Sequence, residues 1–140
     1  RDFESLVRNY FEQYLGQFPA QVFDKINENF IRCSFFELVS RYLSSCYTFA
    51  IEQNNSEGRA DFEMTGIPGT DYYTDDRLVE FKYYKAKEAE KMLELDAPLP
   101  EHVEQVHRYA EDTLRHFPNY KVRTYVVYIC ANRGWKCWET

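Results

Sequence analysis

Two short segments of the sequence carry residues whose types and spacing suit chemistry. The first reads GRADF over residues 58–62 and contains Asp61, and the second reads VEFK over residues 79–82. Because side chains alternate along a strand, Glu80 and Lys82 of the second segment must lie on the same face. Either charge would be costly to bury alone among apolar neighbours. The pattern therefore requires mutual pairing, a solvent-facing side or a ligand.

Asp61 lies on the strand predicted to precede that of Glu80. Neighbouring strands lie about 4.8 Å apart, so the two carboxylates can converge on one point. Such carboxylates repel each other unless a cation lies between them, and oxygen-only ligands suit Mg²⁺ or Mn²⁺ rather than zinc. We therefore predict a Mg²⁺ or Mn²⁺ site. The alternative is a structural cluster of ion pairs within a sheet.

An Asp followed, after a loop, by Glu-x-Lys on a strand resembles the motif of the PD-(D/E)XK nuclease superfamily, which has a restriction-endonuclease-like fold. The resemblance covers residues 30–130, and it includes the Gly-Arg before Asp61 and a following helix with Gln105. Ala60 stands where the family motif has proline. The residues of these two motif segments are most similar to those of nuclease-type domains at the C-terminus of AAA-ATPase-like bacterial proteins.

The resemblance implies a role for each matching residue. Asp61 and Glu80 would ligate the metal. Lys82 would position and help to deprotonate the attacking water, or stabilise charge on the phosphate. Gln105 would orient a water or contact a backbone phosphate, with a solvated helix position as its alternative. It belongs to a polar row that also contains the residues His102, Tyr109 and His116.

Family members often add a metal-binding Glu from the first core helix, and two residues are candidates here. Glu37 flanks the apolar stripe of that helix, although an i,i+4 ion pair with Arg41 also explains it. Glu52, at the end of the first strand, competes for the same role. A surface carboxylate at a strand end is its alternative.

Hydrophobic periodicity predicts the elements that position these residues. We expect helices over 3–15, 29–43 and 101–117, strands over 46–52, 59–64, 77–84 and 121–130, and a short edge strand over 135–138. The charged segment 85–94 is either helical or mobile. Three successive strands favour antiparallel pairing, and the strand–helix–strand unit favours one right-handed parallel crossover.

These elements predict an α/β fold with a restriction-endonuclease-like α/β/α core. Its small mixed sheet follows the order helix, three strands, helix, strand. We divide the chain into an N-terminal helical extension, residues 1–29, and a nuclease-like domain, residues 30–140. The extension is either the first part of the nuclease-like domain or the end of a preceding part of the protein.

Composition limits the classes of protein that this chain can represent. Its 140 residues correspond to one domain, and the net charge of −6 argues against binding DNA or an anionic membrane through bulk charge. Its four cysteines form no Cys-x-x-Cys pair, which argues against a zinc site and favours reduced thiols in a cytoplasmic protein.

The function that these observations favour is that of a metal-dependent nuclease acting on nucleic acid, with DNA as the expected substrate. The alternative is a catalytically inactive module of the same fold that binds protein or nucleic acid and is attached to an ATPase-type protein. Expected partners are nucleic acid, an ATPase domain of the same or another chain, and a second copy in a homodimer. Because the sequence begins with Arg1, we expect a domain of a larger protein.

Overall fold

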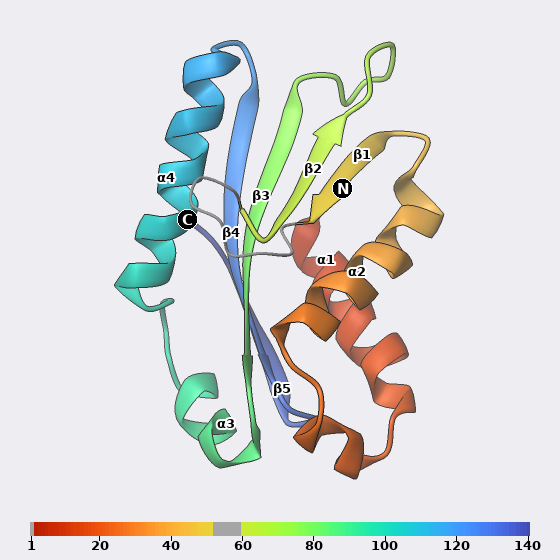
Figure 1. Ribbon diagram of the computed structural model, residues 1–140, viewed down its shortest axis with the longest axis vertical. Coiled ribbons are helices and arrows are strands. Elements are labelled where there is room, and N and C mark those ends of the chain that lie inside the picture. The colour runs from red at the N-terminus through yellow and green to blue at the C-terminus, as the bar shows by residue number, and fades with distance from the viewer. Residues whose placement is uncertain (1, 52–59) are drawn as a thin grey trace.

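The computed structural model describes residues 2–51 and 60–140, which form a mixed β-sheet with helices on both faces (Figure 1). The helices are α1 (Phe3–Asn9), α2 (Glu28–Leu43), α3 (Ala86–Leu93) and α4 (Pro100–His116). The strands are β1 (Tyr47–Ile51), β2 (Phe62–Gly66), β3 (Asp75–Tyr84), β4 (Lys121–Cys130) and β5 (Gly134–Glu139). A π-helical turn, η1 (Tyr10–Tyr14), and two 3₁₀ turns, η2 (Leu15–Gln17) and η3 (Ala20–Asp24), lie between α1 and α2.

The strands follow one another across the sheet in the order β1-β2-β3-β4-β5, which is also their order along the chain. The first three pair antiparallel, β3 and β4 pair parallel, and β5 pairs antiparallel with β4. Parallel pairing of consecutive strands needs a long connection, which here contains α3 and α4. The predicted α/β fold, with three antiparallel strands and one parallel crossover, is confirmed.

The two faces of the sheet bury separate apolar clusters. The residues of β3 alternate between them: Val79 and Phe81 pack beneath α1 and α2, whereas Leu78 packs beneath α3 and α4. Figure 1 shows these helix pairs on opposite sides of the sheet. Glu80 and Lys82 follow Leu78 at two-residue steps, so they lie on the α3/α4 face.

Helix α2 is fixed at its start and along its buried side. The side chain of Asn27 caps it by accepting a hydrogen bond from the backbone N–H of Phe30 (3.0 Å). The ring of Phe35 packs edge-on against Phe62 (5.2 Å between centroids) and lies 5.1 Å from Phe81. These contacts hold α2 beside the middle of β3, where the candidate site lies.

The N-terminal helices complete the core on the α2 side of the sheet. Phe3, Val7 and Tyr10 are at most 1% exposed, and the Phe3 ring stacks on Tyr125 of β4 at 4.3 Å. The single helix predicted over 3–15 changes to η1 at Tyr10, whose buried hydroxyl bonds to Ser34 Oγ (2.6 Å). Residues 3–26 thus share the core of the sheet, and the division predicted at residue 30 falls within the first turn of α2.

A core role for α1 predicts a measurable loss of stability when its packing is reduced. Leu6→Ala removes a side chain that is 7% exposed, and we expect a loss of about 2 kcal/mol in the free energy of unfolding, measured by urea denaturation. Leu114→Ala on α4 is the matched control, because Leu114 is 39% exposed, and its loss should stay below about 0.5 kcal/mol. If Leu6→Ala lost as little stability as Leu114→Ala, α1 would lie outside the cooperative unit.

None of the helices described here is both long and apolar enough to cross a membrane.

Candidate active site

Asp61, Glu80 and Lys82 lie together where the start of β2 meets the middle of β3. Phe62 pairs with Val79, so the residue before Phe62 lies beside Glu80. Lys82 Nζ is 3.3 Å from Glu80 Oε2, and the charge of Asp61 acts on both side chains. The predicted sharing of one strand face by Glu80 and Lys82, and the approach of Asp61 to Glu80, are confirmed.

The carboxylate of Asp61 is held by two donors from different elements. Its Oδ1 accepts from Arg32 Nη1 of α2 (2.9 Å), and its Oδ2 accepts from the backbone N–H of Phe81 (3.0 Å). The prediction that the strand over 59–64 contains Asp61 is wrong. Within the described residues β2 begins at Phe62, because the chain bends at Asp61 to make these two hydrogen bonds.

The two carboxyl groups of the site are buried together, and this changes their acidity. Glu80 is 1% exposed, and burial followed by the nearby charge of Asp61 raises its pKa to about 8. Burial also raises the pKa of Asp61, although Arg32 opposes the shift. Glu80 Oε1 is buried and has no hydrogen-bond partner among the described residues. A buried carboxyl oxygen without a donor is unusual and is typical of a site that needs a ligand.

Lys82 is surrounded by negative charge. Burial disfavours its charged form, but the carboxylates of Glu28, Glu80 and Asp61 outweigh that effect and raise its pKa. Glu28 lies in the first turn of α2, where its Oε1 is 4.0 Å from Lys82 Nζ and its Oε2 accepts from the backbone N–H of Tyr83 (3.5 Å). Lys82 is therefore held as a cation.

Glu28, which the sequence reasoning missed, is the glutamate that α2 brings to the site. Glu37 does not reach it. Its side chain is 70% exposed and forms an ion pair with Arg41 (3.7 Å), and nine residues along the helix place it about 13 Å from Glu28. The prediction of Glu37 at the site is wrong. The available signal was the first turn of α2, since Asn27 is a good N-cap and an acidic residue follows it. Glu52 lies outside the described residues.

Gln105 lies on α4, and its Nε2 donates to the hydroxyl of Tyr109 (3.1 Å) one turn further along. No hydrogen bond or ion pair described here joins Gln105 to Asp61, Glu80 or Lys82. The other residues of its polar row lie in two different places. His102 contacts Tyr128 of β4, whereas Tyr109 and His116 line a separate hollow.

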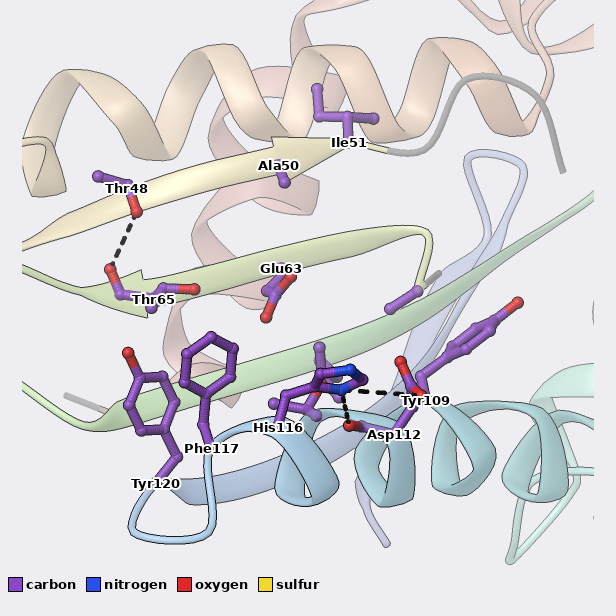
Figure 2. A pocket seen from close by; sticks show the side chains of 13 residues that line it. Thr48, Ala50, Ile51, Glu63, Thr65, Tyr109, Asp112, His116, Phe117 and Tyr120 are labelled. Carbon is purple, nitrogen blue, oxygen red and sulfur yellow. Dashed lines mark hydrogen bonds and ion pairs between the residues drawn. The ribbon is translucent and has the colours of Figure 1, made fainter. Parts of the chain in front are cut away.

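That hollow, of about 480 Å³, lies between α4 and the open face of β1 and β2 (Figure 2). In Figure 2 Glu63 lies on the sheet side, while Tyr109, Asp112 and His116 lie on the helix side. His116 and Asp112 of the helix wall are 4.0 Å apart, from His116 Nδ1 to a carboxylate oxygen. Among the described residues that line the hollow there is no lysine or arginine, so the positive charge of Lys82 distinguishes the candidate site from it.

A second acidic pair lies in the sheet near this hollow. Asp76 is completely buried, and burial, followed by a hydrogen bond and charge repulsion from Glu63, raises its pKa to about 8. Thr65 Oγ1 donates to Asp76 Oδ1 (3.1 Å). Asp76 Oδ2 is buried and, among the described residues, has no hydrogen-bond partner. Asp76 thus resembles Glu80 in burial and pKa but is not paired with Lys82.

The residues of the site suit a hard divalent cation. The described part of the chain contains no group of three or more His, Cys, Asp and Glu residues that could hold a metal ion. Magnesium, however, is commonly held by one or two carboxylates, with water and substrate phosphate completing its shell. Glu80 Oε1 has no donor among the residues that the structure describes, and the charge of Asp61 acts on Glu80, so these two carboxylates fit such a cation as its protein ligands.

The order of the elements, together with an aspartate at the start of β2 and Glu-x-Lys on β3, defines an α/β protein with a restriction-endonuclease-like core. The chain belongs to the PD-(D/E)XK nuclease superfamily, whose family model matches residues 26–139. Members of this superfamily generally hydrolyse phosphodiester bonds and typically use divalent metal ions. No curated protein sequence gives a significant match to the chain.

Proposed function

We propose that this chain is a divalent-metal-dependent nuclease that hydrolyses phosphodiester bonds of nucleic acid, with Asp61, Glu80 and Lys82 as its catalytic residues. The observation that carries the proposal is Glu80. It is a carboxyl group buried inside a strand, with a pKa raised to about 8, one oxygen without a donor, and a lysine ammonium at 3.3 Å. Buried and unsatisfied carboxylates destabilise a fold, and such groups concentrate at functional sites.

Asp61 and Glu80 would hold the metal ion. Arg32 and the Phe81 N–H orient Asp61, and each of its oxygens keeps a further lone pair after accepting one bond. A divalent cation bound there supplies Lewis-acid polarisation of a phosphate oxygen and a more acidic water. The protein supplies the fixed positions of the two carboxylates, because both are anchored in or beside the sheet.

Lys82 acts as a fixed positive charge towards the phosphate. Its ammonium is retained as a cation by Glu28 and Glu80, so it is a poor base towards the attacking water. A preorganised cation beside a reacting phosphate stabilises the charge that develops during in-line displacement. Of the two roles that the family resemblance implies for this lysine, charge stabilisation is the one that its surroundings support.

A hollow of about 580 Å³ adjoins the site at the first turn of α2. Its residues support a contact with the phosphate backbone of a nucleic acid. Its lining includes Glu28, Arg32, Lys85 and Lys87. Lys87 is exposed, whereas the ammonium of Lys85 is engaged by the carbonyl of Asp24 (2.9 Å). The lysines here offer contacts to phosphates flanking the scissile bond, and the net charge of −6 limits the length of such an interface.

The proposal predicts cleavage that requires both a divalent metal and Lys82. Labelled DNA and RNA oligonucleotides, single- and double-stranded, are incubated with the protein in Mg²⁺, in Mn²⁺ and in excess EDTA. We expect cleavage only in the reactions that contain Mg²⁺ or Mn²⁺. Lys82→Met should lower the cleavage rate by about 10²-fold. Lys87→Met, which removes an exposed lysine nearby, should lose less than about 10-fold.

Two results would contradict the mechanism. Cleavage that persists in EDTA would exclude metal-dependent chemistry, and Lys82→Met with the wild-type rate would exclude the role of Lys82. Isothermal titration calorimetry gives a readout that does not depend on activity. Mg²⁺ or Mn²⁺ at millimolar concentration should bind the wild-type protein and fail to bind the double variant D61N/E80Q.

A further inference from the structure

Tyr128 of β4 connects α4 to the candidate site through its hydroxyl group. The side chain is completely buried, and its hydroxyl meets the backbone N–H of Leu99 (2.9 Å) and Nδ1 of His102 (2.6 Å). The rings of His102 and Tyr128 are nearly perpendicular, with 5.5 Å between their centroids. The imidazole is therefore fixed in position by a buried group on the sheet.

The hydrogen bonds of Tyr128 determine which nitrogen of His102 carries the proton. The N–H of Leu99 donates to the Tyr128 oxygen (2.9 Å), which leaves the hydroxyl hydrogen of Tyr128 to be donated elsewhere. A buried hydroxyl hydrogen needs an acceptor, and His102 Nδ1 is its only acceptor among the described hydrogen bonds. Nδ1 is thus unprotonated, and Nε2 carries the hydrogen.

His102 lies beside the positive residue of the site. Lys82 and Tyr128 are partners in the parallel register of β3 and β4, about 4.8 Å apart on neighbouring strands. Burial, and then the charge of Lys82, lowers the pKa of His102. Its ring is half-buried, and Nε2 makes no hydrogen bond to the described residues. A neutral imidazole therefore retains one N–H next to Lys82 that is free to bind a ligand.

We propose that His102 is a substrate-binding residue whose Nε2–H donates to a non-bridging oxygen of a phosphate at or next to the scissile bond. This inference rests on the proposed nuclease function, because Lys82 attracts the phosphate to this place. A neutral N–H suits that position, since a second full positive charge next to Lys82 would be repelled. Hydrogen bonds to charged phosphate oxygens are among the stronger ones, so the contact is expected to be measurable.

Steady-state cleavage of an oligonucleotide in Mg²⁺ tests the proposal. We expect His102→Ala to lower kcat/KM by about 10- to 100-fold, mainly through KM. His102→Gln, whose amide N–H can reach a similar point, should recover most of that loss. His107→Ala is the matched control on the same helix, because its Nε2 contacts only Thr140 Oγ1 (3.1 Å) among the described residues, and it should keep the wild-type kcat/KM.

A second measurement separates a binding role from a structural one. Nitrogen chemical shifts of His102 in the full chain should show a protonated Nε2 and a bare Nδ1. The Nε2–H signal should move when a short oligonucleotide carrying non-hydrolysable phosphate linkages is added, and the signals of His107 should not.

Three results would overturn the assignment: a protonated Nδ1, a His102→Ala variant with the kcat/KM of His107→Ala, or an equal loss in His102→Gln and His102→Ala. Absence of cleavage by the wild-type protein on every nucleic acid would instead contradict the proposed function. The tautomer would remain measurable in that case.

Discussion

Glu80→Gln is expected to abolish cleavage and, at the same time, to stabilise the folded chain above neutral pH. The loss of rate should be at least about 10³-fold, since a ligand for the metal and the partner of Lys82 are both altered. Stability should rise because a neutral amide replaces a carboxyl group that is 1% exposed and lies next to Asp61. A gain in stability with a loss of activity is characteristic of residues kept for function.

The pH dependence of this stabilisation follows from the direction of the pKa shift. The pKa of Glu80 is raised from 4.5 to about 8 in the folded chain. Between these values the folded state keeps a proton that the unfolded state has released, so stability falls as pH rises. The slope from one group is at most about 1.4 kcal/mol per pH unit. Glu80→Gln removes this contribution, and its advantage over the wild type should be largest above pH 8.

Asp76→Asn is the matched control for Glu80→Gln. Asp76 is equally buried, its pKa is also about 8, and it has no contact with Lys82. Both variants should therefore flatten the decline of stability with pH, measured by urea denaturation from pH 5 to 9, but Asp76→Asn should keep cleavage. Loss of cleavage in both variants would assign the effect to the general electrostatics of β3, and the role of Glu80 as a ligand would fail.

Arg32→Met is expected to destabilise the chain by about 3 to 5 kcal/mol, because it leaves the buried Asp61 without its cationic partner. Arg32 is 4% exposed and donates to Asp61 Oδ1 at 2.9 Å, and it also bonds to the side chain of Asn29. Arg41→Met, on the same helix, removes an exposed ion pair with Glu37 and should cost less than about 1 kcal/mol. Urea denaturation at pH 7 measures both.

The partner of Arg32 is identified by a double-mutant cycle. In an Asp61→Asn background no carboxylate is left uncompensated, so Arg32→Met should cost clearly less than it does in the wild type. An equal cost in the two backgrounds would mean that the stabilisation comes from the packing of the arginine stem, and not from its charge. The cycle therefore tests the role of α2 in holding the site together.

The sequence predicted the fold well where elements are long and periodic. Strand β4 and helix α4 occur within one residue of the expected bounds. The segment 85–94 was ambiguous because it is highly charged, and it forms α3 because Ala89 and Met92 are buried against the sheet. The start of β2 was predicted wrongly, since the bend at Asp61 depends on hydrogen bonds from distant residues.

The candidate site was predicted only in part for a similar reason. The alternation along β3 was sufficient to place Glu80 and Lys82 on one face. Glu28 was missed because the glutamate that reaches the site depends on which end of α2 meets β3, and a helical pattern contains no information about that. The contact of His102 with Tyr128 joins α4 to β4 and has no local signature. An attached ATPase domain, a homodimer and a cytoplasmic location stay predictions.

The order of the strands has a consequence for how the chain folds. Because each strand pairs with its neighbour in sequence, the pairings of β1 with β2, β2 with β3 and β4 with β5 close short loops and are kinetically inexpensive. The contacts of α1 are the opposite case, since Phe3 stacks on Tyr125 and Arg8 lies over the ring of Trp135. During synthesis on the ribosome, α1 therefore emerges well before β4 and β5, the strands against which Phe3 and Arg8 pack. Part of the apolar face of α1 therefore stays unpacked until these two strands have been synthesised.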